Sequence, residues 1–290
     1  MFLPLRLIKS ALLLSVPVLI LCLGSVTAQA VQISPPRAVI GPDKKTSYVY
    51  IKNDSDAAKA YRFRWKNLAM DKDGNLRNLD VVDASLVPDF RPAEDYIRFS
   101  PRRTTLRPGE TQRVTFLVRR PSDMVDGEYR SHFVVEQVPN VTKESDAAAK
   151  MAAEVAPTVT GIGVDIVVSR AFPVYLLNGN VQASLSLDNA QLKLNPNAGA
   201  EGQATHLVDL DFSKTGNRSI IATADILCGN TSISSAPRLF AVYAEADRRS
   251  EVIFVTPSLA SDCSNMRAVI TAHADDQLAG QVLVESAVGR

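Results

Sequence analysis

The sequence predicts an all-β protein made of two immunoglobulin-like β-sandwiches in tandem. Apolar and polar residues alternate with period two through most of the chain, which is typical of half-buried strands. Turn-forming Gly, Pro, Asp and Asn residues separate these segments at short intervals. Beyond an N-terminal export signal, about 260 residues remain, which is too many for one ordinary sandwich. We expect a first sandwich over residues 31–177 and a second over residues 178–290.

Residues 1–30 have the pattern of a secretory signal peptide. Arg6 and Lys9 form a short basic start, an apolar run follows over residues 11–23, and Ala28-Gln29-Ala30 supplies a small-x-small cleavage pattern. The apolar run is too short for a membrane-spanning helix. We therefore expect removal of the signal, localisation in the periplasm and no stable membrane insertion of the rest of the chain.

The first half of the chain contains strands of alternating pattern and one segment of different character. The expected strands cover residues 46–53, 60–65, 112–118 and 128–137. Residues 141–156 are rich in Ala and charged residues, and we expect a mobile loop there. A strand-like run over residues 158–176 follows, which is longer than usual. Pro173 within it cannot donate a ladder hydrogen bond, which favours an edge strand.

The second half of the chain predicts seven further strands and one disulfide. The strands are expected over residues 183–187, 205–212, 218–227, 239–244, 251–255, 267–273 and 278–285. Cys228 and Cys263 are the two cysteines left after removal of the signal, and an even pair in an exported chain indicates a disulfide. Closing this loop should stabilise the fold by roughly 3.8 kcal/mol in the chain-entropy model.

The charge of the chain is balanced. The full sequence carries 32 basic and 31 acidic residues, a net charge of +1. Removal of the signal takes away Arg6 and Lys9, so the exported chain has one acidic residue in excess. Bulk charge therefore argues against nucleic acid or an anionic membrane as the main partner.

No pattern in the sequence indicates catalysis, a metal or a cofactor. His132, His206 and His273 lie in separate strand-like segments without metal-ligand spacing. We expect the adjacent Asp275 and Asp276 to be solvated in a turn. Residues 71–75 faintly resemble a calcium loop but lack its distal Glu, and we expect a simple turn.

Several segments, taken in order, resemble the periplasmic chaperones of the chaperone–usher pilus pathway. They begin with Pro36-Arg37-Ala38-Val39 on the first expected strand and continue through Phe99-Ser100-Pro101 and the stretch from Leu106 to Val114. Asp126-Gly127-Glu128-Tyr129 follows, then Ala171-Phe172-Pro173-Val174 at the end of the long strand. The resemblance covers most of the first expected sandwich and, more weakly, the second.

The resemblance implies that the long strand is lent to a pilus subunit whose own sandwich lacks a strand. This donor-strand complementation is a form of β-augmentation, in which backbone pairing gives affinity and side-chain pockets give specificity. Alternation places four aliphatic side chains on one face of the strand: Ile162, Val164, Ile166 and Val168. The family then delivers the subunit to an outer-membrane usher, so pilus subunits and the usher are the expected partners.

The resemblance also implies a pair of basic residues that bind the C-terminal carboxylate of the subunit between the two sandwiches. Arg37 is at the matching position on the first strand, and a guanidinium can bind a carboxylate bidentately. We expect Arg170, near the end of the donor strand closest to the other sandwich, as its partner, with Arg130 as a substitute.

Two other classes of function remain open. A structural pilus subunit or adhesin would use the same sandwiches, and would pair the strand over residues 158–176 internally. A secreted hydrolase would need His and carboxylate side chains brought together from distant positions, because fold alone does not define function.

Overall fold

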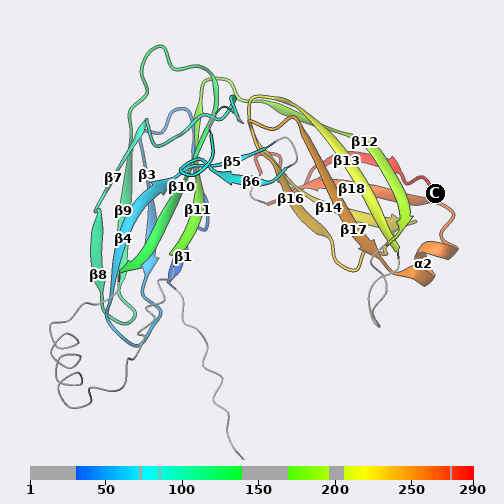
Figure 1. Ribbon diagram of the computed structural model, residues 1–290, viewed down its shortest axis with the longest axis horizontal. Coiled ribbons are helices and arrows are strands. Elements are labelled where there is room, and N and C mark those ends of the chain that lie inside the picture. Colours follow the sequence, from blue (N-terminus) through cyan, green and yellow to red (C-terminus); the bar gives the residue numbers. More distant parts are fainter. Residues whose placement is uncertain are drawn as a thin grey trace, which may run out of the picture.

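The chain forms two β-sandwiches joined end to end at an angle (Figure 1). The computed structural model describes residues 31–71, 74–83, 85, 87–138, 169–195, 206–274 and 276–290. The predicted all-β class and its two sandwiches are confirmed. The predicted signal, the loop over residues 141–156 and the four aliphatic residues Ile162, Val164, Ile166 and Val168 lie outside the described residues.

The first sandwich packs a four-stranded sheet against a five-stranded sheet. The four-stranded sheet has the order β1 (Gln32–Ser34), β3 (Thr46–Lys52), β9 (Thr111–Val118), β7 (Ile97–Ser100). The five-stranded sheet has the order β2 (Ala38–Ile40), β11 (Ser169–Asn178), β10 (Gly127–Val138), β4 (Lys59–Lys66), β8 (Arg103–Leu106). All pairs are antiparallel except β2 with β11.

The first expected strand is divided between the two sheets. β1 pairs with β3, whereas β2 pairs with β11 in the opposite sheet. Pro35 and Pro36 stand at the crossing, where their missing N–H groups interrupt ladder pairing. Arg37 directly precedes β2. The crossing therefore places Arg37 beside β11, on the side opposite to β10.

The core of the first sandwich is aromatic. The ring of Phe133 lies at its centre, with centroids 5.2 Å from Trp65, 4.8 Å from Phe99 and 5.1 Å from Phe116, all edge to face. Alternation on β9 directs Val114, Phe116 and other apolar residues inward, as the sequence predicts. Such geometries add to the stabilisation that burial of the rings provides.

The second sandwich has a smaller sheet of three strands and a larger one of five. The order in the smaller sheet is β12 (Ala183–Leu194), β13 (His206–Gly216), β17 (Arg248–Val255). The larger sheet contains β15 (Thr231–Ser232), β14 (Ile220–Cys228), β18 (Met266–Ala272) and β19 (Val282–Ala287), and β16 (Arg238–Val242) also pairs with β14. A short helix not anticipated from the sequence, α2 (Pro257–Asp262), follows β17 and starts at a proline. The core is mainly aliphatic, with one stacked pair of Phe212 and Phe240.

The predicted disulfide is present. Cys228 at the end of β14 and Cys263 after α2 are bonded, with Cα atoms 5.8 Å apart. The bridge joins the end of β14 to the segment that leads into β18. It therefore fixes the end of the larger sheet that lies away from the first sandwich.

A hairpin of the first half of the chain reaches into the second sandwich. β5 (Leu68–Met70) and β6 (Leu76–Asn78) pair only with one another among the described strands, and Figure 1 shows them projecting from the first sandwich toward β16. The backbone N–H of Gly74 donates to the carbonyl of Asp71, and the backbone N–H of Asp71 donates to the carbonyl of Asn75. A turn is therefore present, as predicted. Met70 is buried within the core of the second sandwich.

The link between the sandwiches is closely packed at two glycines. Gly179 has φ +57°, and a Cβ there would lie 1.7 Å from the carboxylate of Asp126. That carboxylate accepts the N–H of Asn180 at 3.0 Å. Gly216 has φ +98° and lies against the backbone of Gln182. Both positions require a residue without a Cβ, which explains the glycines.

Candidate functional site in the cleft between the sandwiches

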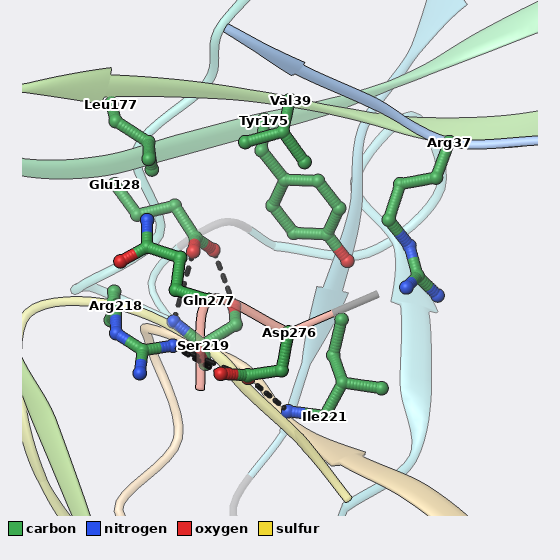
Figure 2. A pocket seen from close by; sticks show the side chains of 10 residues that line it. All are labelled: Arg37, Val39, Glu128, Tyr175, Leu177, Arg218, Ser219, Ile221, Asp276 and Gln277. Carbon is green, nitrogen blue, oxygen red and sulfur yellow. Dashed lines mark hydrogen bonds and ion pairs between the residues drawn. The ribbon is translucent and has the colours of Figure 1, made fainter. Parts of the chain in front are cut away.

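A cleft lies where β2 and β11 of the first sandwich face the second sandwich. Figure 2 shows Arg37 and Tyr175 extending in the same direction, toward Ile221 and Asp276 of the second sandwich. The guanidinium carbon of Arg37 is 6.0 Å from the centroid of the Tyr175 ring. The parallel register of Val39 with Tyr175 sets this arrangement, because it places the residue before β2 beside the middle of β11.

Two hollows in the cleft meet at Arg37 and Ile221, which line both. The smaller has a volume of about 30 Å³ and is also lined by Tyr175, Val39 and Asp276. The larger, about 470 Å³, is an open groove between the β5–β6 hairpin and β16. Its wall is about half apolar and half polar, and its apolar members include Met70, Leu76, Leu239, Phe240 and Tyr243. The cleft thus combines cationic side chains with apolar ones.

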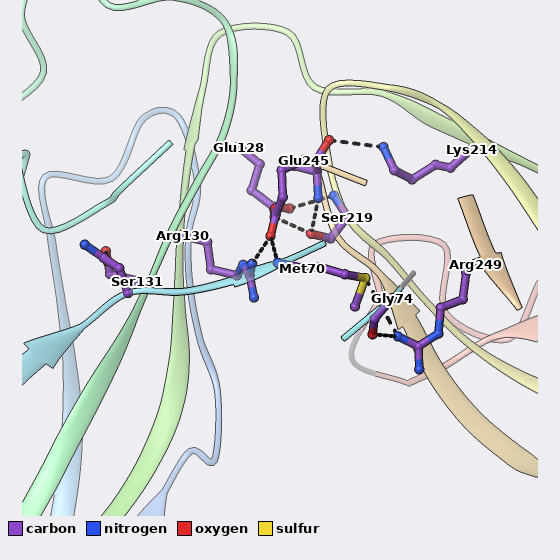
Figure 3. A network of polar contacts seen from close by, with 11 residues as sticks. Met70, Gly74, Glu128, Arg130, Ser131, Lys214, Ser219, Glu245 and Arg249 are labelled. Carbon is purple, nitrogen blue, oxygen red and sulfur yellow. Dashed lines mark hydrogen bonds and ion pairs between the residues drawn. The ribbon is translucent and has the colours of Figure 1, made fainter. Parts of the chain in front are cut away.

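Behind the cleft, a buried network of polar side chains joins the two sandwiches (Figure 3). Arg130 of β10 forms an ion pair with Glu245, and its guanidinium carbon lies 3.5 Å from the centroid of the Tyr243 ring. Glu245 also accepts the backbone N–H of Met70 at 2.8 Å. Both charged side chains are almost completely buried. Tyr243 separates this ion pair from the open groove, since it contacts Arg130 and lines the groove.

A second part of the same network centres on Glu128. Its carboxylate accepts the backbone N–H of Ser219 at 2.9 Å and the Ser219 hydroxyl, which in turn accepts the N–H of Ala244. Burial raises the pKa of Glu128, and the hydrogen bonds from Ser219 oppose that effect. Burial likewise lowers the pKa of Lys214, against the attraction of Glu128 and Glu245. These groups fix the contact between the sandwiches.

Asp276 has a structural role in the second sandwich, contrary to the expectation that it is solvated. It is buried, pairs with Arg218 and accepts the backbone N–H of Ile221 at 2.9 Å. Asp275 lies outside the described residues. Arg218 is basic and lies near the cleft, but its guanidinium is already paired with Asp276 within the chain.

The structure brings Arg37 into the cleft but does not bring Arg170 there. The expectation that Arg170 lies near the second sandwich is wrong, because β11 begins at Ser169 and reaches the junction at Asn178. The Arg170 side chain donates to the carbonyl of Val31 at 2.7 Å and lines neither hollow. Arg130 is no substitute, since its charge is buried against Glu245.

β11 has an open side along its first half. β10 pairs with it throughout, from Ser169 to Asn178, whereas β2 covers only Val174 to Leu176 on the other side. Within the described part of the chain, no strand covers Ser169 to Pro173 on that side. This edge continues in sequence from the segment that contains Ile162, Val164, Ile166 and Val168.

The histidines are dispersed in the described structure. His132 is on β10, His206 begins β13 and His273 follows β18. Burial and the nearby Arg130 lower the pKa of His132 to about 3. Across the described residues no group of three or more His, Cys, Asp or Glu side chains is placed to hold a metal ion. The described residues also contain no helix that is long and apolar enough to traverse a membrane.

The sequence reasoning missed the residues of the second sandwich that complete this region. Tyr243, Glu245 and Leu239 come from β16 and the turn after it, which contact the first sandwich only in the folded chain. The β5–β6 hairpin was also missed, although Asp73-Gly74 marks its turn in the sequence.

Comparisons with known proteins give structural neighbours but no sequence relatives. No family model matches the chain, and no curated protein matches its sequence. The chain is similar in structure to the YadV chaperone, at a TM-score of 0.46 and 10% identity over 89% of this chain and 98% of that one. It is also similar to a CsuC–CsuE chaperone–tip adhesion subunit complex from the archaic chaperone-usher Csu pili of Acinetobacter baumannii, at 0.47 and 11% over 90% and 98%. A third is the Salmonella enterica SafA pilin in complex with the SafB chaperone, at 0.42 and 8% over 91% and 97%.

All three neighbours contain a chaperone, which in two of them is in complex with a tip adhesion subunit or a pilin. The class of molecule that the fold and cleft define is an all-β protein of two sandwiches with a basic and apolar cleft between them. At these identities the likeness assigns no function by itself.

Proposed function

We propose that this protein is a non-enzymatic periplasmic chaperone that binds pilus subunits by donor-strand complementation and delivers them to an outer-membrane usher. One observation supports this most strongly: the open edge of β11 leads along the strand to a cleft that holds Arg37. A partner strand added at that edge would bring its chain end to the cleft.

The edge offers the backbone groups that β-augmentation needs. Among the described residues, Ser169 to Pro173 pair on one side only, and the sequence before them alternates aliphatic and small or polar residues. A strand added there would place Ile162, Val164, Ile166 and Val168 in the groove of an incomplete sandwich. Each aliphatic side chain would contribute roughly 1.5–3 kcal/mol when buried. Arg37 would bind the C-terminal carboxylate of the same subunit.

Replacement of single donor residues tests this proposal. Val164→Asp or Ile166→Asp should strongly reduce capture of pilus subunits, because a carboxylate would enter an apolar groove unpaired. The free protein should lose little stability. Capture is measured by co-purification from the periplasm and identification of the bound proteins by mass spectrometry.

Ser169→Asp is the matched control, because Ser169 is exposed and alternation places it on the other face of the strand. It should retain capture. If Val164→Asp unfolds the protein instead, these residues belong to the chain's own core, and the structural-subunit alternative is favoured.

A further inference from the structure

The outer face of the four-stranded sheet in the first sandwich carries a cluster of exposed apolar and aromatic side chains. Tyr48 and Tyr50 of β3 are 53% and 41% exposed, and their ring centroids lie 5.5 Å apart. Leu117 of the neighbouring strand β9 is 56% exposed. Alternation directs these side chains outward, because the residues on either side of them along β3 and β9 are buried or half-buried. Such a grouping on one face is typical of a surface that binds a partner.

Two exposed arginines lie on the same face. Arg113 of β9 is directly opposite Tyr50, and Arg98 of β7 is directly opposite Leu117. Neither arginine forms an ion pair within the described part of the chain. The four strands of the sheet, all of which are described, contain no Asp or Glu. The face therefore carries positive charge that the sheet itself does not compensate.

The outer face of the opposite sheet is different, because its arginines are neutralised within the chain. Arg62 and Arg64 of β4 pair with Glu136 of β10 at 2.8 and 3.0 Å. Lys52, at the end of β3, is likewise paired with Asp54. The uncompensated charge is thus that of the two arginines on β7 and β9. Complementary charge steers association and suppresses wrong partners, so an acidic partner fits this face.

The dimensions of the face fit one segment of chain better than a broad protein surface. Four strands about 4.8 Å apart span roughly 14 Å, and the seven residues of β3 extend over roughly 24 Å. The resulting outline of roughly 350 Å² is well below the ~800 Å² that each partner contributes to a standard interface. Tyrosine and arginine are also enriched among the residues that dominate binding energy at interfaces.

We propose that the outer face of the four-stranded sheet binds an acidic segment of a partner protein. Carboxylates of the segment pair with Arg98 and Arg113. Its apolar or aromatic side chains pack on Tyr48, Tyr50 and Leu117. This site goes beyond the proposed function, because it lies on the sheet opposite to β11. A strand added at the open edge of β11 and an acidic segment on this face can therefore be bound at the same time.

The site is tested with the full exported chain and three acidic polymers: a random copolymer of Glu and Tyr, polyglutamate, and polygalacturonate as an acidic glycan. Calorimetry should show the tightest binding for the copolymer, which supplies both carboxylates and rings, and weaker binding for polyglutamate. Binding should weaken as ionic strength rises, because the charges are exposed. Absence of copolymer binding would overturn the inference. Polygalacturonate that binds as tightly as the copolymer would also overturn it, in favour of a glycan ligand.

Arg113→Glu should weaken binding of both the copolymer and polyglutamate at least about 10-fold, because it replaces attraction by repulsion. The melting temperature should not change, since the side chain is exposed. Arg103→Glu is the matched control, because Arg103 is exposed on β8 of the opposite sheet, and it should bind as the wild type does. Equal weakening by the two variants would show a response to overall charge and overturn the site. Arg98→Glu gives the same test at a second position if Arg113→Glu fails to fold.

Leu117→Ser and Tyr50→Ser test the apolar part of the face. Each should weaken binding of the copolymer about 3- to 10-fold and leave binding of polyglutamate unchanged, because the lost contacts are with the rings of the copolymer. Leu194→Ser is the control, since Leu194 is 72% exposed on β12 of the second sandwich. Unchanged copolymer binding by both Leu117→Ser and Tyr50→Ser would show that charge alone explains the binding.

Capture of pilus subunits by the same variants separates this site from that of the proposed function. Arg113→Glu should capture subunits as well as the wild type does, measured by co-purification from the periplasm. Val164→Asp, which should lose capture, should still bind the copolymer with wild-type affinity. Loss of subunit capture by Arg113→Glu at an unchanged melting temperature would show that the two surfaces are not independent, and would overturn the inference of a separate partner.

Discussion

The closed and open parts of the junction use similar residues for different purposes. In the closed part, Arg130 stacks on Tyr243 and is paired with Glu245, away from solvent. In the open part, Arg37 lies over Tyr175 and borders a groove large enough for a side chain. An arginine beside a tyrosine therefore says little about role by itself. Exposure distinguishes the two arginines, because the Arg130 ion pair is closed off from solvent whereas Arg37 lines an open groove.

The largest effect is expected from Glu245→Ala in the closed part. The change leaves Arg130 buried without its counter-charge, which should lower the free energy of unfolding by about 3–5 kcal/mol. Urea denaturation measures the loss. Asp209→Ala is the control, because Asp209 pairs with an exposed Lys193 and its loss should cost less than about 1 kcal/mol. Equal losses for the two variants would contradict the distinction between buried and exposed pairs.

The free energy of unfolding should also fall at acid pH because of His132, which lies close to Arg130 of the closed part. The folded chain keeps His132 neutral down to a pKa of about 3, whereas the unfolded chain takes up the proton near pH 6.5. The stabilising contribution of neutral His132 is therefore complete above pH 6.5 and is lost as the pH falls toward 3. Between pH 7 and pH 5 the free energy of unfolding should fall by about 2 kcal/mol from this residue. His132→Leu should remove that slope, and an unchanged slope would refute the assignment.

A smaller effect is expected where the hairpin meets the second sandwich. Arg249→Ala removes the hydrogen bond to the carbonyl of Gly74, while Glu251 keeps its bond from Arg238 at 2.7 Å. We expect a loss of about 1–2 kcal/mol and faster proteolytic cleavage within residues 71–78. Arg248→Ala, at the exposed neighbouring position, should have neither effect. Cleavage at the wild-type rate in Arg249→Ala would show that this contact does not hold the hairpin.

The smallest effect on stability is expected in the open part. Arg37→Ala should change the free energy of unfolding by less than about 1 kcal/mol, because the side chain fills no core position. The same variant should greatly weaken capture of subunits, since a carboxylate would lose its charged hydrogen bonds. Thermal unfolding and co-purification give the two readouts. A variant that unfolds would place Arg37 among the structural charges instead.

The sequence predicts the strands well because alternation is a local property. The prediction over residues 112–118 matches β9, and the disulfide follows from two cysteines in an exported chain. The prediction of a half-buried strand over residues 128–137 is wrong, because both faces of β10 are buried up to Val135. The near end of that strand packs under the second sandwich, and nothing in its own sequence shows this.

The candidate site was less predictable from the sequence, because its contacts join segments that are far apart in the chain. Arg37 was identified through a resemblance to the first strand of a known family. Nothing in the local sequence marks Tyr175, and its unpaired hydroxyl is visible only in the folded cleft. Arg130 could not be recognised as structural, because its partner Glu245 lies far along the chain.

The β5–β6 hairpin has a consequence for the order in which the molecule assembles. Met70 belongs to the core of the second sandwich, yet it is synthesised well before the strands around it, because the chain is made from its N-terminus. Until those strands arrive, this apolar side chain has no core to enter. A fragment that begins at residue 178 would lack a piece of its own interior. The two sandwiches are separate in topology but are completed together.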